Sequence, residues 1–369
     1  MVSVPFLDIK AQNNALRAEI EQAVAPVVSE AEFILGPAVE RFERDFAEFI
    51  GVGHCIGVNS GTTALHMALQ ACGVGPGDEV ITTPHTWIST SWAISYAGAR
   101  PVYVDIDPNT YNVDPDRVEH AITSRTKAIV PVHLYGHAAG VESLKHLAEA
   151  HDLVMIEDAA QAHGAIVSKK RAGSFGKAGC FSFYPSKNLG AFGEAGAVVT
   201  DDEELAKRIR RLRDHAQEVR HHHVELGFNS RMDGLQGAVL ETKLRHLVDW
   251  NEARRKIAAC YRRELDTLPG LELPCASSEE SHVWHLFVVL VRDIERYALQ
   301  GRLSDKKIGT DIHYPTPVPF QPAYGELRHR RGDFPVAEDA AGCCLSLPMF
   351  PELTEEQIEH TIDALKSLL

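Results

Sequence analysis

The sequence predicts an α/β fold: a mostly parallel sheet covered by helices, followed by a small C-terminal α+β domain. From residue 54 to about residue 215, apolar runs alternate with segments of helical periodicity, which is the pattern of a parallel sheet joined by crossover helices. Two of the runs, AIVPVHL (128–134) and LVMIE (153–157), are apolar without alternation. Continuous apolar runs are typical of strands that helices cover on both faces of a parallel sheet.

The expected elements follow one another along the first two thirds of the chain. Helical periodicity covers residues 11–50, with a break at FILGP and a second helix over 39–50. The sequence SGTTALHMALQAC, from residue 60, predicts the helix after the first strand. The strands are expected at 54–59, 79–83, 101–106, 128–134, 153–157, 180–184 and 197–200, and the later helices at 87–97, 115–122, 141–151 and 203–215.

The pattern changes near residue 229. The stretch after Gly237 has no further glycine before Gly270 and predicts one or two long helices. Loops follow, and then the last expected elements: a strand at 284–291, a helix at 294–304, a strand at 310–314, a loop at 315–335 and a terminal helix from residue 354. We therefore expect a large domain over 1–250 and a small α+β domain over 251–369.

Composition limits the class of protein. The chain has 369 residues, of which 44% are hydrophobic and 24% charged, as in an ordinary globular protein, and its net charge of −14 argues against nucleic acid or an anionic membrane as the main partner. No signal peptide and no membrane span are expected. The seven cysteines are odd in number and lack CxxC spacing, which indicates reduced thiols in a cytoplasmic protein.

One lysine stands in an unusual setting. Lys187 lies in CFSFYPSKNLGAFGEAG (180–196), between an aromatic strand and a glycine-rich turn. Partial burial there would help an amine to lose its proton and become a nucleophile. The alternative is an ordinary solvated lysine, which is the commoner case for a lysine taken alone.

Polar residues follow three of the expected strands. At SGTTAL (60–65) a strand leads into a helix, so free N–H groups near Gly61 and Thr62 could bind a phosphate, or Ser60 could simply cap the helix. Asp158 follows Glu157 at the end of another strand, where a buried carboxylate needs a cation such as a protonated ring nitrogen. Trp87 could stack on a flat ligand, although a core tryptophan is the commoner reading.

Two other stretches carry less chemistry. GVGPGD (73–78) follows a helix and precedes a strand, the reverse of a dinucleotide-binding motif, so we interpret it as a turn. The run RHHHVELGFNSRMD (220–233) places three histidines side by side on a loop, a spacing that does not suit a metal. We expect no metal site, and interpret the loop as one that reaches an anionic substrate.

Taken together, these stretches resemble the sugar aminotransferases of the DegT/StrS type, which have the aspartate-aminotransferase fold (fold type I) of enzymes that use pyridoxal 5′-phosphate (PLP). The resemblance runs through almost the whole chain. It rests on VPFLDIKAQ, FILGP, GVNSGTTAL, GDEVITTPHTWIST, PVYVDIDPNTYNVDP, IEDAAQAHGA, FSFYPSKNLGAFGEAG, FNSRMDGLQ, IHYPTP, QPAY and LSLPMFPELTEEQ.

The resemblance implies a role for each residue of interest. Lys187 would form the Schiff base with PLP, and Asp158 would pair with the pyridine nitrogen. The other implied cofactor contacts are Gly61, Thr62 and Ser182 at the phosphate, Gln161 at the ring hydroxyl, Trp87 on the ring face, and Asn229 at the phosphate of the neighbouring subunit. The residues implied at the sugar-nucleotide pocket are His163, His215, Arg231, His313 and Tyr314. The family thus implies a homodimer that shares its sites.

The resemblance also implies a reaction. An amino acid, by family habit glutamate, would donate its amino group through pyridoxamine phosphate to a keto group of a nucleotide-linked sugar. KNLGAFG and the histidine-rich run favour carbon 3 of a hexose, either a dTDP-3-keto-6-deoxyhexose or a UDP-linked 3-keto-uronic acid. The alternatives are a 4-keto sugar aminotransferase and a PLP-binding regulatory or sensor protein without turnover. Envelope polysaccharide and secondary-metabolite pathways both remain open.

Overall fold

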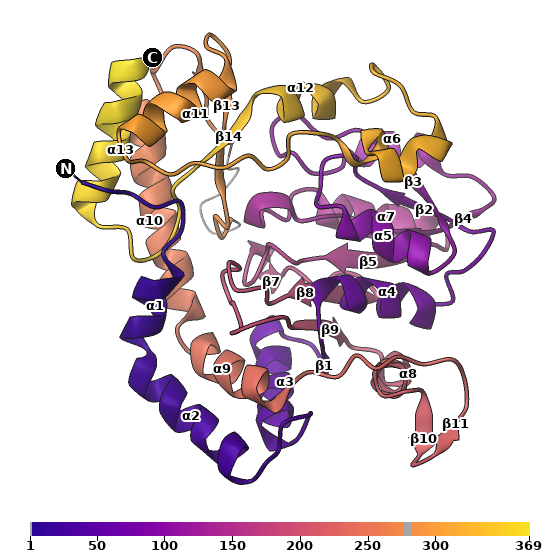
Figure 1. Ribbon diagram of the computed structural model, residues 1–369. Helices are drawn as coiled ribbons and strands as arrows, with labels where there is room; N and C mark the ends of the chain where they lie inside the picture. The colour runs from indigo at the N-terminus through magenta and orange to yellow at the C-terminus, as the bar shows by residue number, and fades with distance from the viewer. Residues whose placement is uncertain (1, 276–281) are drawn as a thin grey trace.

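A mostly parallel sheet of seven strands organises the large part of the protein, seen here in a computed structural model that describes residues 2–275 and 282–369 (Figure 1). The strand order is β1-β9-β8-β5-β4-β2-β3, and only β9 runs antiparallel to its neighbours. The fold class predicted from the sequence is therefore confirmed. The strands are β1 (His54–Val58), β2 (Glu79–Thr82), β3 (Arg100–Tyr103), β4 (Thr126–Ile129), β5 (Val154–Asp158), β8 (Ala178–Ser182) and β9 (Gly196–Thr200).

Helices cover both faces of this sheet. One buried cluster joins it to α3 (Pro37–Ile50) and α7 (Val141–Ala150), and a second joins it to α4 (Gly61–Ala71), α5 (Ser89–Tyr96) and α8 (Glu203–Arg213). Coverage on both faces explains why the central strands have continuous apolar sequences. The other helices of this part are α1 (Ile9–Ala15), α2 (Arg17–Ser29), α6 (Pro115–Ala121) and α9 (Gly234–Leu244), and two short hairpins are β6 (Ile166–Val167) with β7 (Lys170–Arg171) and β10 (Gln217–Val219) with β11 (His222–His223).

The C-terminal part has a core of its own, which includes the N-terminal segment. An antiparallel sheet of β12 (Leu271–Glu272), β13 (Phe287–Val291) and β14 (Cys344–Leu347) packs with α10 (Leu247–Leu265), α11 (Arg296–Asp305) and α13 (Glu355–Leu368). Val4 is buried in the same cluster and bridges to Ile308, so the first residues lie beside α13 (Figure 1). The boundary expected at residue 250 falls inside α10, and we keep the two-domain division as a proposal.

The structure corrects the sequence-based elements in the C-terminal third. The expected strand at 310–314 is wrong: Asp311 makes only an isolated bridge to Ser346. Pro315 and Pro317 lack the N–H groups that would extend a ladder, and the carbonyl of His313 accepts a hydrogen bond from the Tyr135 hydroxyl instead. The loop expected at 315–335 contains two 3-10 helices, η3 (Val318–Phe320) and η4 (Pro322–Leu327), and its last residue begins α12 (Pro335–Cys343). The sequence analysis also did not assign β12 and β14. The end of the loop expected before residue 284 lies outside the described residues (276–281).

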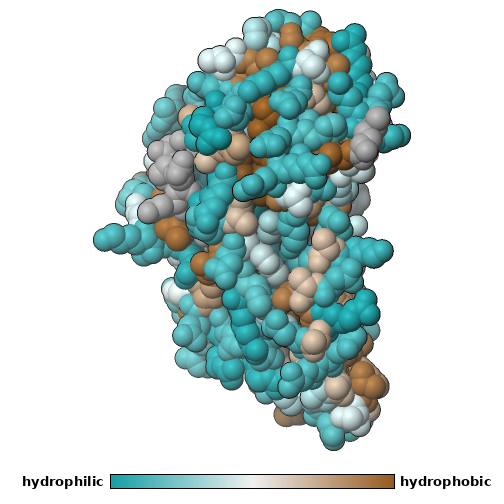
Figure 2. All heavy atoms as spheres, turned by 90° about the vertical axis from the view of Figure 1, so that its left-hand side faces the viewer, coloured by the Kyte–Doolittle hydropathy of each residue, from teal (hydrophilic) through white to brown (hydrophobic). Residues whose placement is uncertain are grey.

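Polar side chains cover most of the face over α1, α2 and α13 (Figure 2). Where the chain is described, no helix combines the length and the apolar character that crossing a membrane requires.

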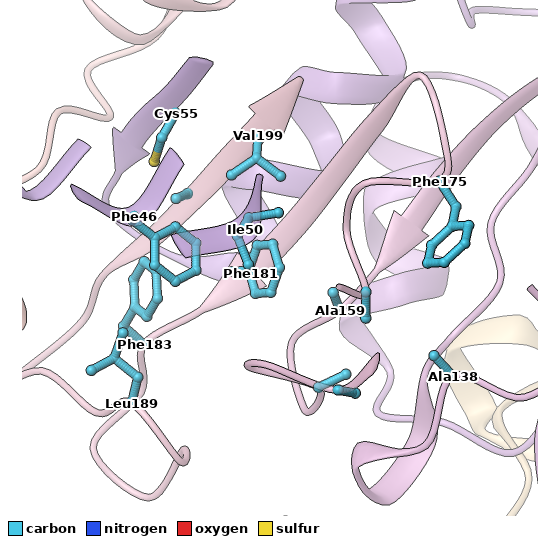
Figure 3. Close-up of a cluster of buried hydrophobic side chains, with 14 of the residues drawn as sticks. Phe46, Ile50, Cys55, Ala138, Ala159, Phe175, Phe181, Phe183, Leu189 and Val199 are labelled. Atoms are coloured by element: carbon cyan, nitrogen blue, oxygen red, sulfur yellow. The ribbon is translucent and has the colours of Figure 1, made fainter. Parts of the chain in front are cut away.

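Edge-to-face contacts between aromatic rings hold α3 against the sheet (Figure 3). Phe46 of α3 is fully buried and meets Phe181 and Phe183 edge to face, with ring centroids 5.0 and 5.3 Å apart. Phe181 lies on β8 and Phe183 follows it, only four residues before Lys187. This contact therefore holds the strand that leads into the lysine turn.

Phe46→Ala should lower the free energy of unfolding by about 3–5 kcal/mol, because it leaves a cavity among the rings of Phe42, Phe49, Phe181 and Phe183. Phe46→Leu, which refills part of the space, should cost less. Urea unfolding followed by circular dichroism measures both. Unfolding of Phe46→Ala at the urea concentration of the native protein would contradict this packing.

Candidate active site

A cavity of about 450 Å³ opens at the carboxyl ends of the parallel strands, the edge of an α/β sheet where ligands bind. It gathers residues that are far apart in the sequence, from the start of α4 to the segment before α12. Nine residues singled out from the sequence line it: Gly61, Thr62, Trp87, Asp158, Gln161, Ser182, Lys187, His313 and Tyr314. The sequence motifs therefore converge on one site.

Lys187 occupies the turn between β8 and β9. Its backbone N–H donates to the carbonyl of Tyr184 over 2.8 Å, which closes the turn and directs the side chain into the cavity. Burial lowers the pKa of the Lys187 amine to about 8, and the charge of Asp158 acts in the opposite direction. The amine is thus close to the point where it gives up its proton near neutral pH, as a nucleophile requires.

Asp158 ends β5 and is 5% exposed. The Thr90 hydroxyl donates to its Oδ2 over 2.7 Å, and the Ala160 N–H donates to Oδ1 over 3.2 Å. Burial raises the pKa of Asp158, while these hydrogen bonds and the charge of Lys187 oppose that rise. A carboxylate in this position is stabilised by any cation that enters the cavity.

The neighbouring Glu157 has a separate, structural role. Its carboxylate, which is fully buried, accepts hydrogen bonds from the N–H groups of Gly173, Phe175 and Gly176 and lies 2.7 Å from His133 Nε2. These contacts fix the loop before β8, on the opposite side of β5 from Asp158. Of the two adjacent carboxylates, only Asp158 lines the cavity.

The first turn of α4 and Ser182 form a cradle for an anion. Ser60 caps α4 by accepting from the Thr63 N–H, so the N–H groups of Gly61 and Thr62 have no partner inside the helix. A Cβ on Gly61 would come within 2.6 Å of Ser182 Cβ, so only glycine allows this approach of strand and helix. Backbone donors, the helix dipole and two hydroxyls all favour a phosphate there.

Aromatic and amide side chains form another part of the cavity wall. Trp87 precedes α5 and is 58% exposed, with its ring centroid 5.8 Å from that of Tyr314. The Gln161 amide donates to the Tyr314 hydroxyl over 3.1 Å and accepts from the Tyr135 N–H over 2.7 Å, which leaves one amide hydrogen for a ligand. His313 is held by the Ser346 hydroxyl, 2.8 Å from its Nδ1.

Four residues expected at the site lie outside this cavity. His163 is fully buried, with Nε2 2.9 Å from the Ser182 carbonyl, so its position does not support contact with a substrate. Asn229, Arg231 and His215 form a separate group beside the β10–β11 hairpin, where Arg231 pairs with Asp214 and donates to Asn229. Asn229 is exposed and pairs with Asp214 in an isolated bridge.

The cavity also contains residues that the sequence analysis did not identify. Those with clear chemistry are Ser89, Thr90, Tyr184, Glu194 and His285. Ser89 and Thr90 belong to PHTWIST and Glu194 to FGEAG, stretches already singled out for other residues. No sequence motif marks His285, because its segment has the pattern of an ordinary buried strand.

The residues present fit PLP in three separate places. The cradle at Gly61, Thr62 and Ser182 suits the phosphate, and the buried carboxylate of Asp158 suits a protonated ring nitrogen. The amine of Lys187, whose pKa burial lowers to about 8, suits an aldehyde. Trp87 offers an aromatic face for the ring. Each contact needs a different chemistry, and the cavity supplies all of them.

Asp158→Asn should make the cofactor-free protein progressively more stable than the native protein as pH rises. Burial raises the pKa of Asp158 in the folded state. At a pH between the unfolded and the folded pKa, the folded protein therefore keeps a proton that the unfolded chain has released. In this range the stability of the native protein falls as pH rises. Asparagine removes that loss, about 1.4 kcal/mol for each unit of pKa difference. Urea unfolding from about pH 4, close to the pKa of an aspartate in the unfolded chain, up to pH 8 measures it.

Thr90→Val provides the matched variant. It removes the hydroxyl that favours the charged form of Asp158, so the decline in stability should extend to higher pH than in the native protein. A stability difference between Asp158→Asn and the native protein that does not vary with pH would contradict both expectations.

Known proteins resemble this chain over nearly its whole length. The chain is 46% identical over 363 residues to dTDP-3-amino-3,4,6-trideoxy-alpha-D-glucose transaminase of Streptomyces venezuelae, covering 98% of this chain and 95% of that one. It is 47% identical over 366 residues to erythromycin biosynthesis sensory transduction protein EryC1 of Saccharopolyspora erythraea, covering 99% and 100%. The crystal structure of S. venezuelae DesV in complex with a ketimine intermediate matches with a TM-score of 0.97 and 46% identity, over 100% of this chain and 98% of that chain.

Residues 14–366 match the model of the DegT/DnrJ/EryC1/StrS aminotransferase family. This family is the one that the sequence motifs resemble, and PLP is its cofactor. The chain therefore belongs to the DegT/DnrJ/EryC1/StrS aminotransferase family.

Proposed function

We propose that the protein moves an amino group from glutamate to the carbon-3 keto group of a nucleotide-linked hexose, in a ping-pong reaction through pyridoxamine phosphate. That it is a PLP-dependent sugar-nucleotide aminotransferase follows from its family. The observation that carries the proposal is the single cavity that holds Lys187, Asp158 and the anion cradle. The donor and the position of the keto group are the parts that remain to be tested.

Lys187 and Asp158 have the two central roles in this proposal. PLP supplies an electron sink that stabilises negative charge at the carbon bearing the amino group. Lys187 would hold the cofactor before the donor arrives and, once displaced, would take up and return the proton of the donor's α-carbon. A pKa of about 8 suits both tasks, because the same amine must give up and take back a proton. Asp158 would stabilise a protonated ring nitrogen.

The remaining residues bind and orient. Gly61, Thr62 and Ser182 would hold the phosphate, and Trp87 would cover one face of the ring. Gln161 would donate its free amide hydrogen to the ring hydroxyl. His313 and Tyr314 line the same cavity and would contact the sugar.

A second subunit would complete the site. Asn229, Arg231 and His215 lie away from their own chain's cavity, as expected if they serve the cavity of a partner. Large apolar side chains are exposed on several segments: Leu226, at 89%, lies shortly before Asn229 in the sequence, Trp92 and Tyr96 lie on α5, and Phe192 lies between β8 and β9. Such exposure favours burial in an interface. We propose a homodimer in which each chain supplies Asn229 to the other.

Glutamate should convert the PLP-loaded protein to its pyridoxamine phosphate form, with loss of the visible absorption band of the lysine-bound cofactor and release of one keto acid. A keto sugar nucleotide should restore the band.

Lys187→Ala should lack the band and lose at least about 10³-fold in turnover, since it removes the proton carrier. Lys243→Met is the control: it removes another buried lysine, whose amine lies over the rings of Phe192 and Trp250, and it should keep the band.

A band that glutamate leaves unchanged would remove glutamate as the donor. If no amino acid changed it, a PLP-binding sensor without turnover would be the better description. A panel of 3-keto and 4-keto sugar nucleotides, with the position of the new amine determined by NMR, tests carbon 3 against carbon 4.

Mixed dimers of Lys187→Ala and Asn229→Ala test the shared site. If Asn229 serves the partner, each heterodimer has one intact site, and random mixing of two inactive variants should restore about a quarter of native activity. If Asn229 serves its own chain, no site in the mixture is intact. Mixtures without activity, despite heterodimers detected by native mass spectrometry, would contradict the proposal.

A further inference from the structure

His285 is a buried histidine at the base of the cavity that the roles above do not use. It is 7% exposed, precedes β13 by two residues and lines the cavity together with Lys187. Its Nδ1 lies 3.1 Å from the side-chain oxygen of Asn188, the residue that follows Lys187. One histidine thus contacts both the lysine turn and the cavity.

A chain of side-chain amides determines which ring nitrogen of His285 carries the proton. Asn251 donates to the carbonyl of His163 over 2.8 Å, so its own oxygen must face Asn188. Asn188 donates to that oxygen over 2.9 Å and to the carbonyl of Val283 over 3.0 Å. Because carbonyl oxygens only accept, the Asn188 oxygen is left as an acceptor, and His285 Nδ1 must be the donor.

The other nitrogen, Nε2, is consequently an acceptor. Within residues 2–275 and 282–369, no protein group hydrogen-bonds to Nε2, and it is not among the buried atoms that lack a partner, so it is open to the cavity. Burial, followed by the charges of Lys187 and Arg254, holds the pKa of His285 well below its usual range. The ring therefore stays neutral and keeps this lone pair free at working pH.

We propose that His285 is a positioning residue whose Nε2 accepts a hydrogen bond from the Lys187 ammonium after that amine has been displaced from the bound cofactor. The bond would hold the freed amine in place and favour its protonated form against the effect of burial. The inference rests on the proposed role of Lys187, but the hydrogen bond itself requires no turnover. His285 Nε2 would thus be a fixed hydrogen-bond acceptor for Lys187, the proposed proton carrier.

Other groups around Lys187 also affect its proton affinity. Asp158 attracts the charged amine, and burial disfavours it. The other titratable side chains that line the cavity or lie near the amine are His163, Tyr184, Glu194, His313 and Tyr314. Burial lowers the pKa of His163 to about 3 and of His313 to about 4, so both are neutral at pH 7. The variants below leave all of these groups in place.

Two substitutions separate the acceptor from its structural support. His285→Gln can place an amide oxygen where Nε2 lies but loses the bond to Asn188. His285→Asn keeps a donor to Asn188 but has no acceptor that reaches the cavity. The full-length protein loaded with pyridoxamine phosphate, in which Lys187 is free, is trace-labelled with acetic anhydride at pH 6–10, and mass spectrometry follows the peptide that carries Lys187.

The labelling curve of Lys187 in His285→Asn should shift to lower pH by about one unit, because the hydrogen bond that favours the ammonium is lost. His285→Gln should label like the native protein. Thermal unfolding of both variants checks that they are folded. An unshifted curve in His285→Asn, or an equal shift in both variants, would overturn the proposal. Since labelling requires no amino donor, it gives an answer even if glutamate turnover fails.

Discussion

The active site depends on keeping two opposite charges buried at the carboxyl ends of parallel strands. Burial raises the pKa of Asp158 and lowers that of Lys187, and each group reduces the shift of the other. Neither charge could remain there without help. Thr90 supports the carboxylate with a hydrogen bond, and a bound cofactor would supply the missing cation. The cost to stability is localised in the residues that the reaction needs, which is common at active sites.

A second layer of buried polar contacts holds this arrangement in place. Glu157 fixes the loop before β8 through three backbone N–H groups, and Asn188 joins the lysine turn to Asn251 of α10. Because α10 leads into the C-terminal core, the position of Lys187 is coupled to that part of the chain. Fully satisfied networks of this kind give a site one geometry, since any displaced member would leave a buried polar group unpaired.

Much of this could be predicted from local sequence. The strands of the large sheet are apolar runs bounded by turns, and the residues at their carboxyl ends include Gly61, Trp87 and Asp158, which do meet in one cavity. Strand order and the reversed direction of β9 could not be predicted, because they depend on pairing between distant segments. The strand expected at 310–314 failed for a related reason. Its apolar pattern is that of a strand, but Tyr135 and two prolines prevent a ladder.

Residues that act through neighbours were the hardest to find. Thr90 is important because its hydroxyl donates a hydrogen bond to Asp158, which is distant in sequence. His285 is important because Asn188, also distant in sequence, fixes its tautomer. Conversely, the sequence placed His163 beside Gln161, but the turn after β5 directs it into the core between Phe181 and Phe183. Asn229, Arg231 and His215 do not line their own chain's cavity, and no local sequence pattern distinguishes them from residues that do.

We propose that Lys187 is the amine that holds PLP. Lys243, a second buried lysine of this chain, is the residue against which that assignment can be tested. Burial lowers the pKa of Lys243 to about 8 as well, but Lys243 does not line the cavity. Borohydride reduction of the PLP-loaded protein, followed by peptide mapping, locates the attached cofactor directly. We predict that the phosphopyridoxyl group is attached to Lys187 and to no other lysine. The same group on Lys243, or on any other lysine in place of Lys187, would contradict it.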